Sequence, residues 1–142
     1  MKSIIKIFTL AIIALGFLTV SFAQVSATAN ASGTIVTPIA ITKTVDLNFG
    51  NIAVGSTAGT VVLAPAGTRT ATGGVTLPAT SGTVSAAEFN VTGQAGYTFS
   101  ITLPSTPTTV TSGANSMTVD TFTSTPTPTG TLTGGAQTVK VG

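Results

Sequence analysis

The sequence predicts an all-β protein, a sandwich of about seven to eight short antiparallel strands. Apolar and polar residues alternate with a period of two through much of the chain, which is typical of strands with one buried face. Clusters of Gly, Pro and Asn separate these stretches at short intervals, as turns do in sandwiches. Beyond the first 23 residues, no stretch has the 3.6-residue apolar period of an amphipathic helix.

The first 23 residues have the three parts of a secretory signal peptide. Two lysines precede the uncharged apolar stretch Ile7–Val20, and small residues at positions 21 and 23 suit a signal peptidase. We expect cleavage between Ala23 and Gln24, leaving residues 24–142 as a single exported domain with no stable membrane span. The alternative is a retained anchor, but the apolar stretch is shorter than the roughly 20 residues that a spanning helix needs.

Composition and charge exclude several classes of function. Beyond the leader the chain has three basic and three acidic residues, so it lacks the basic surface that nucleic-acid binding needs. The absence of His and Cys excludes His-dependent triads, thiol nucleophiles, disulfides and the common zinc sites. We therefore expect no cofactor, no metal site and no enzymatic activity.

The first two strand candidates lie directly after the leader. Val25–Ile35 has small apolar residues at its odd positions and hydroxyl or amide residues at its even ones, and we expect it to be the first strand. Ile39–Phe49 follows with an apolar face that Lys43 interrupts. A charge on that face indicates a bend or an edge strand.

The clearest strand pattern is Tyr97–Leu103, in which apolar residues alternate with Thr and Ser until Pro104. It follows a turn that we expect at residues 93–96. Gly73-Gly74 predicts a bulge or kink, because Gly weakens a ladder and permits close approach of another backbone. The other strand candidates are Thr60–Leu63, Thr70–Leu77, Phe89–Val91, Met117–Phe122 and Gln137–Val141.

The predicted core is thin, because the chain has no Trp and few aromatic residues. Threonine is the most frequent residue type; its β-branched side chain suits extended backbone, and its hydroxyl keeps the outer face wet. The residues that we expect in the core are Phe49, Phe89, Tyr97, Phe99, Ile101 and Leu103.

Candidate polar sites are weak. A glycosidase needs two carboxylates on either side of one bond, and no spacing pairs Asp46, Glu88 and Asp120, the only acidic residues. We expect each to be solvated at a strand end. Asp46, Asn48 and Asn51 offer oxygen ligands of the kind that calcium prefers, but Asn is also a turn residue, and we favour the turn interpretation.

A run of threonines occupies every odd position from Thr121 to Thr133. Such a run would form a flat hydroxyl ladder of the kind that binds ice or polysaccharide. Pro126, Pro128 and Gly130 interrupt backbone pairing, so we favour the alternative, a mobile stretch rich in Thr and Pro.

Two stretches resemble bacterial exported domains. Leu47–Ile52 is similar to the L-x-F-G signature near the start of fimbrial and coat-protein domains, and Phe89–Ile101 is similar to their central strand–turn–strand. From Ala27 to Gly142 the chain most resembles the bacterial family called domain of unknown function 4402. The motif positions are Leu47, Phe49, Gly50, Gly93, Gly96, Tyr97 and Phe99, supported by Ala31–Ile41 and Gly73–Leu77.

The resemblance implies an exported immunoglobulin-like sandwich and, through its similarity to pilin-type domains, assembly at the cell surface. Pilin-type domains often carry a Cys pair, which this chain lacks around Val36 and Thr92. They also usually close with a hairpin that would begin at Val141-Gly142. Either the sequence is truncated there, or a strand from another chain completes the sandwich.

The resemblance and the composition together predict an exported, non-enzymatic structural protein of the cell surface, fimbria- or adhesin-like. Its expected partners are copies of itself or other surface subunits, joined by β-strand addition with Val25–Ile35 as the donor; the alternative is that this segment pairs inside its own domain. The alternative function is a secreted module that binds surface glycans. Such modules commonly stack exposed aromatics on sugar rings, whereas we expect the only Tyr, Tyr97, to be in the core.

Overall fold

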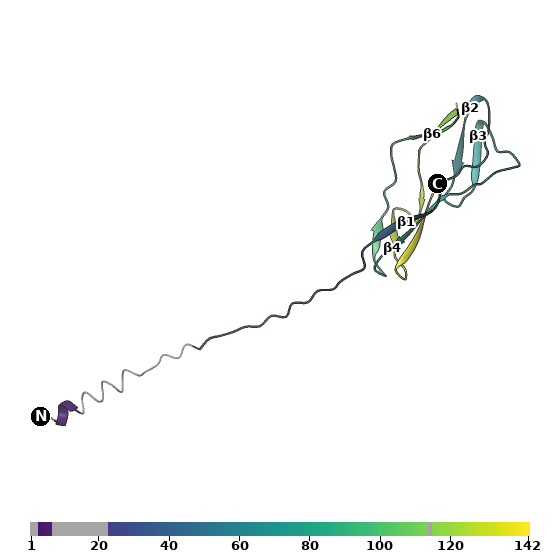
Figure 1. Ribbon diagram of the computed structural model, residues 1–142. Helices are drawn as coiled ribbons and strands as arrows, with labels where there is room; N and C mark the ends of the chain where they lie inside the picture. The colour runs from purple at the N-terminus through teal and green to yellow at the C-terminus, as the bar shows by residue number, and fades with distance from the viewer. Residues whose placement is uncertain (1–2, 7–22, 114) are drawn as a thin grey trace. The chain divides into compact units, whose positions relative to one another are not determined.

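The computed structural model describes residues 3–6, 23–113 and 115–142 (Figure 1). The chain divides after Thr34 into two units. Residues 3–6 are helical, and the apolar stretch Ile7–Val20 of the predicted leader lies outside the described residues. Within the part of the chain that the structure describes, no helix combines the length and the hydropathy of a membrane span.

The second unit contains ten short strands in the described residues, and every ladder between them is antiparallel. The predicted all-β sandwich fold is therefore confirmed, with more strands than expected. The strands are β1 (Ala40–Val45), β2 (Ala53–Leu63), β3 (Arg69–Thr76), β4 (Ala87–Thr92), β5 (Thr98–Ser100), β6 (Thr108–Ser112), β7 (Asn115–Val119), β8 (Ser124–Thr125), β9 (Thr129–Thr131) and β10 (Ala136–Val141).

The largest sheet has four strands in the order β1-β4-β10-β8, and Figure 1 shows β1 beside β4. The register places Phe89 of β4 opposite Val139 of β10, and Asn90 between Thr42 and Thr138. Successive side chains point to opposite faces of a sheet. Phe89 and Val139 therefore lie on an apolar face, and Thr42, Asn90 and Thr138 lie on the opposite, polar face. The apolar face is the inner one.

Residues of the β5–β9 sheet and the loop after β9 pack against this inner face. Val91 and Val139 are 3% and 4% exposed, and Leu132, just after β9, is 2% exposed. As predicted, Phe89, Phe99, Ile101 and Leu103 contact this core. The buried core residues that were not predicted are Ala87, Val91, Leu132, Val139 and Val141.

Two further two-stranded sheets are β2–β3 and β6–β7. The register of β2–β3 shifts between Val54 and Gly59, opposite Gly73-Gly74. A Cβ atom at Gly73 would lie 2.5 Å from the carbonyl oxygen of Ala58, so the two backbones approach too closely for a side chain there. The predicted irregularity at Gly73-Gly74 is confirmed.

The predicted first strand, Val25–Ile35, does not form. Residues 23–39 are in neither strand nor helix and are all exposed, and the side chains at the two ends of the segment are 93% and 99% exposed. The alternating side chains of this segment would suit a strand. A strand also needs a neighbouring strand whose backbone bonds to its N–H and C=O groups. The chain provides no such neighbour among the described residues.

β1 is instead the edge strand of the four-stranded sheet. Its register with β4 shifts between Lys43 and Val45, which confirms that Lys43 marks both an edge and a bend. An inward-facing charge on an edge strand discourages unwanted pairing with other chains.

Two other expectations need correction. The clear alternation of Tyr97–Leu103 yields only the three-residue strand β5, because β9 pairs with Thr98–Ser100 alone. The stretch Thr121–Thr133, expected to be mobile, forms β8 and β9. Its even positions Ser124 and Leu132 are buried while its threonines are exposed. β8 and β9 belong to different sheets, so these threonines form no single ladder.

Candidate functional site

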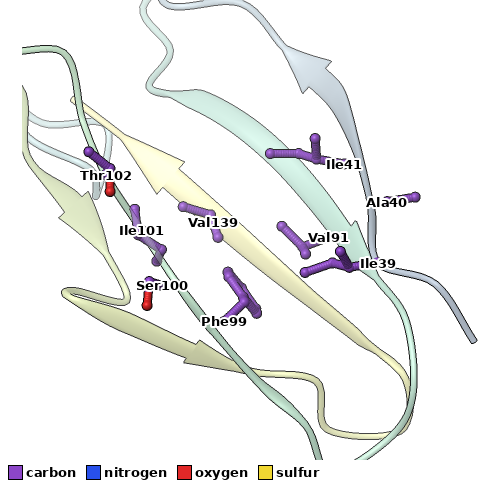
Figure 2. Close-up of a pocket in the computed structure, with 9 residues that line it drawn as sticks. All are labelled: Ile39, Ala40, Ile41, Val91, Phe99, Ser100, Ile101, Thr102 and Val139. Carbon is purple, nitrogen blue, oxygen red and sulfur yellow. The ribbon is translucent and has the colours of Figure 1, made fainter. Parts of the chain in front are cut away.

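An apolar groove of about 280 Å³ lies beside β1. Figure 2 shows Val91 and Val139, both buried, between the β1 wall and the opposite wall formed by residues 99–102. Ile39 and Ile41 stand on the β1 wall and are 59% and 66% exposed. The lining residues are Ile39, Ala40, Ile41, Val91, Phe99, Ser100, Ile101, Thr102 and Val139.

Each wall of the groove has a strand edge without a partner among the described residues. β1 is the outermost strand of its sheet and pairs only with β4, while β5 pairs only with β9. On its β9 side, the second wall is held by the Ile101 N–H, which donates to the Pro128 carbonyl at 2.8 Å. The N–H and C=O groups along the β1 edge away from β4, and along the β5 edge away from β9, are available to a further strand.

The chemistry of the groove is limited to binding. None of its lining residues is ionisable, and its polar side chains are the hydroxyls of Ser100 and Thr102. Acid–base catalysis needs a titratable group, and hard cations need anionic oxygen ligands. Apolar walls next to open backbone edges suit an extended peptide with small apolar side chains.

A second cleft of about 530 Å³ lies between the β2–β3 hairpin and β7. Phe49 contributes to its apolar lining, and Asp120 is its only ionisable lining residue. The Thr121 hydroxyl donates to Asp120 Oδ1 at 3.2 Å. One carboxylate supplies neither the pair that a glycosidase needs nor the ligand set of a divalent cation.

Two of the three carboxylates form ion pairs with different lysines. Asp46 forms an exposed ion pair with Lys43, and Glu88 pairs with Lys140 at 2.7 Å. As expected, Asp46 and Asp120 are exposed just beyond strand ends, but Glu88 lies within β4 and is half-buried. Among the described residues, no group of three His, Cys, Asp or Glu side chains is close enough to hold a metal.

The model of the family described as Domain of unknown function (DUF4402) matches residues 39–142. The chain belongs to this family. The DUF4402 match begins at Ile39, on the groove wall, and covers every strand of the described residues. The resemblance read from the sequence starts earlier, at Ala27. Searches of curated proteins and of solved structures found no match.

In this DUF4402 domain the L-x-F-G motif forms a tight turn. The amide N–H of Gly50 donates to Asn48 Oδ1 at 2.8 Å, which fits the turn interpretation of the asparagines. Gly50 has a φ of 67°, and a Cβ there would lie 2.7 Å from Val84 Cγ2. The Arg69 guanidinium donates to the Phe49 carbonyl and, at 2.9 Å, to the Asn51 carbonyl.

The remaining motif positions shape the start of the second groove wall. The Tyr97 N–H donates to the Gln94 carbonyl at 3.3 Å and closes a β-turn, in which Gly96 has a φ of 82°. A Cβ at Gly93 would lie 2.9 Å from Leu132 Cδ1. In this DUF4402 turn the backbone conformation therefore favours glycine at position 96, and the packing against Leu132 favours glycine at position 93.

Tyr97 does not belong to the core, which corrects the prediction. Its side chain is 56% exposed, because the turn that ends at Tyr97 decides its direction before the β5 ladder begins at Thr98. Leu47 packs against the core. Phe49, also predicted for the core, is half-buried and lines the second cleft instead. In the sequence, Ile39, Ile41 and the other groove residues are recognisable only as members of strand faces, because alternation indicates which face is apolar and not where a groove forms.

Proposed function

We propose that this protein is an exported, non-enzymatic structural component of the bacterial cell surface, fimbria- or adhesin-like, whose subunits associate by β-strand addition. The leader at residues 1–23 supports export. The ion pairing of Asp46 and Glu88 with lysines and the lack of His and Cys speak against catalysis. Ala23 and Gln24 are the expected cleavage pair, and both are exposed.

One observation carries the assembly proposal. Residues 23–39 are exposed, form no strand and contain no charge, although Val25–Ile35 within them alternates like a strand. An uncharged segment of this kind, placed before an edge strand, lacks a backbone partner and is suited to pair with another sheet edge. Head-to-tail addition that does not close into a ring would build filaments.

Export and assembly are tested together by expressing the full-length chain with its leader in a bacterium. We expect the mass of residues 24–142 in the exported fraction and concentration-dependent association in sedimentation velocity. Deleting Val25–Ile35 should abolish association, and a Gly/Ser replacement of the same length controls for spacing. An exported wild-type protein that sediments as a monomer at every concentration contradicts strand addition, and retention of the uncut leader inside the cell contradicts export.

A second candidate, a secreted module for surface glycans, is favoured by the exposure of Tyr97. An exposed aromatic ring is the usual platform for a sugar ring. The test is binding of the monomer to a glycan array. Micromolar binding that is lost in Tyr97→Ala and kept in Tyr97→Phe, a control that retains the aromatic ring, would favour this candidate over assembly.

A further inference from the structure

Resting on the proposed function, we infer that the apolar groove is the acceptor site for residues 25–35 of a second copy of this chain. Residues 25–35 are called the donor segment here, and the nine lining residues of the groove are the acceptor. The inference deepens strand addition, because it names both halves of the contact and the face of the donor that enters the groove.

The acceptor offers backbone pairing and an apolar floor in one place. The outer edge of β1 has no partner in the described residues. Ile41 of β1 and Ile39, just before it, stand largely exposed on the groove wall beside buried Val91 and Val139. A strand paired to this edge would cover both isoleucines and complete the hydrogen bonding of β1. The second cleft also lies beside edge strands, β2 and β7, but its lining includes the charged Asp120.

The size of the groove selects small side chains. One wall spans residues 39–41 and the other residues 99–102. Along a strand, side chains on one face repeat about every 7 Å, so two neighbouring positions of one donor face reach into a groove of this length. A volume of about 280 Å³ accepts small or branched aliphatic side chains without displacing its walls.

The donor segment has the matching face. Its odd positions carry, in order, Val, Ala, Ala, Ala, Gly and Ile. These residues contain no charge and no side chain larger than Ile, so they can enter an uncharged groove without burying an unpaired polar group. Val25 and Ile35 are 93% and 99% exposed in the isolated chain, which leaves this apolar face without a partner.

The other donor face matches the outer surface of the sheet. Its even positions carry only Ser, Thr and Asn. On the outer face of the sheet, Thr42, Asn90 and Thr138 lie in one row across β1, β4 and β10. A donor paired to β1 would therefore extend a polar row with polar residues while its apolar face closes the groove.

A second copy is the occupant that these observations favour over the same chain. The Thr37 N–H lies 3.4 Å from Gln94 Oε1, and Pro38 has no N–H with which to continue a ladder. Folding back onto β1 would require the chain to reverse within residues 36–39. There the Thr37 N–H already has a partner and Pro38 has no N–H to donate. Lys43 follows Ile39 and Ile41 on the same face and opposite Phe89, so a charge marks one end of the acceptor.

Disulfide trapping tests the contact directly, since the chain contains no cysteine. Full-length chains expressed with their leader would carry Ile41→Cys as the acceptor, or Ala27→Cys, Ala29→Cys or Ala31→Cys as donors, and would be mixed and oxidised. Thr28→Cys, on the opposite donor face, is the matched control. We expect at least one odd-position donor to give about tenfold more heterodimer than the control, because facing residues reach disulfide distance.

Each other outcome overturns the inference in a recognisable way. Equal yields from Thr28→Cys and the odd positions would show that no face is selected. Self-association in sedimentation without any heterodimer would overturn the groove assignment and leave strand addition standing elsewhere. A disulfide within single chains carrying both Ile41→Cys and Ala31→Cys, without dimers, would identify the chain's own segment as the occupant. The absence of both association and heterodimers would overturn the proposed function as well.

Discussion

The ring of Phe99 lies against the backbone of Gly130, which is its partner in the β5–β9 ladder. A Cβ atom at Gly130 would lie 2.7 Å from Cε1 of the ring and 2.9 Å from Cε2. The glycine thus gives the ring the space from which it contacts the core and lines the apolar groove.

Gly130→Ala should therefore destabilise the domain by about 1–3 kcal/mol, the usual cost of overpacking. The added methyl group must push the ring out of its place, because backbone pairing holds the glycine. Urea denaturation measures the change in the free energy of unfolding. Gly33→Ala is the control, since a Cβ there meets nothing within 4 Å; an equal loss in both variants would contradict the packing explanation.

Two neighbouring aromatic residues should differ sharply in their contribution to stability. Phe99→Ala should cost about 3 kcal/mol, near the lower end for aromatic truncation because the ring is only half-buried. Tyr97→Ala should cost less than about 1 kcal/mol, because Tyr97 is 56% exposed. Thermal and urea melts of both variants test this, and the reverse order would mean that Tyr97 belongs to the core after all.

Arg69 should stabilise the turn of the L-x-F-G motif. Arg69→Met removes the cationic donor from the carbonyls of Phe49 and Asn51, and we expect a loss of about 2–3 kcal/mol, as for hydrogen bonds to charged groups. Asp46→Asn, which disrupts only the exposed ion pair with Lys43, should cost less than about 1 kcal/mol. Chemical denaturation of both variants checks the difference, and indistinguishable midpoints would refute the proposed role of Arg69.

Lys43 should limit unspecific pairing at the edge of β1. Lys43→Val leaves an uninterrupted apolar face next to the open edge, and we expect lower solubility and faster, irregular aggregation. Lys140→Val removes a charge from β10, which is paired on both sides, and serves as the control. Light scattering at matched concentrations should separate the two variants; similar aggregation would attribute the effect to net charge alone.

Local patterns were sufficient to predict the all-β class, the strand Gln137–Val141, the irregularity at Gly73-Gly74 and the position of Lys43 at an edge. Alternation and glycine placement report the direction of side chains and the constraints on a short piece of backbone, and these are local properties. The turn around Gly93 and Gly96 was predicted for the same reason, because the Tyr97 N–H closes it on the nearby Gln94 carbonyl. Its bonds from the Gly93 and Gly96 N–H groups to the distant Gly135 and Leu132 carbonyls could not be predicted from the local pattern.

Which segments pair with one another as strands was decided by the tertiary structure alone. Val25–Ile35 alternates as well as several true strands but remains unpaired, whereas the Thr/Pro stretch acquires β8 and β9 because β10 and β5 lie beside it. The groove likewise depends on Val91 and Val139, which are 48 positions apart in the sequence and come together only because β4 and β10 share a ladder. Backbone hydrogen bonds between distant segments carry no signature in either segment, so only the folded chain shows which edges are filled and which stay open.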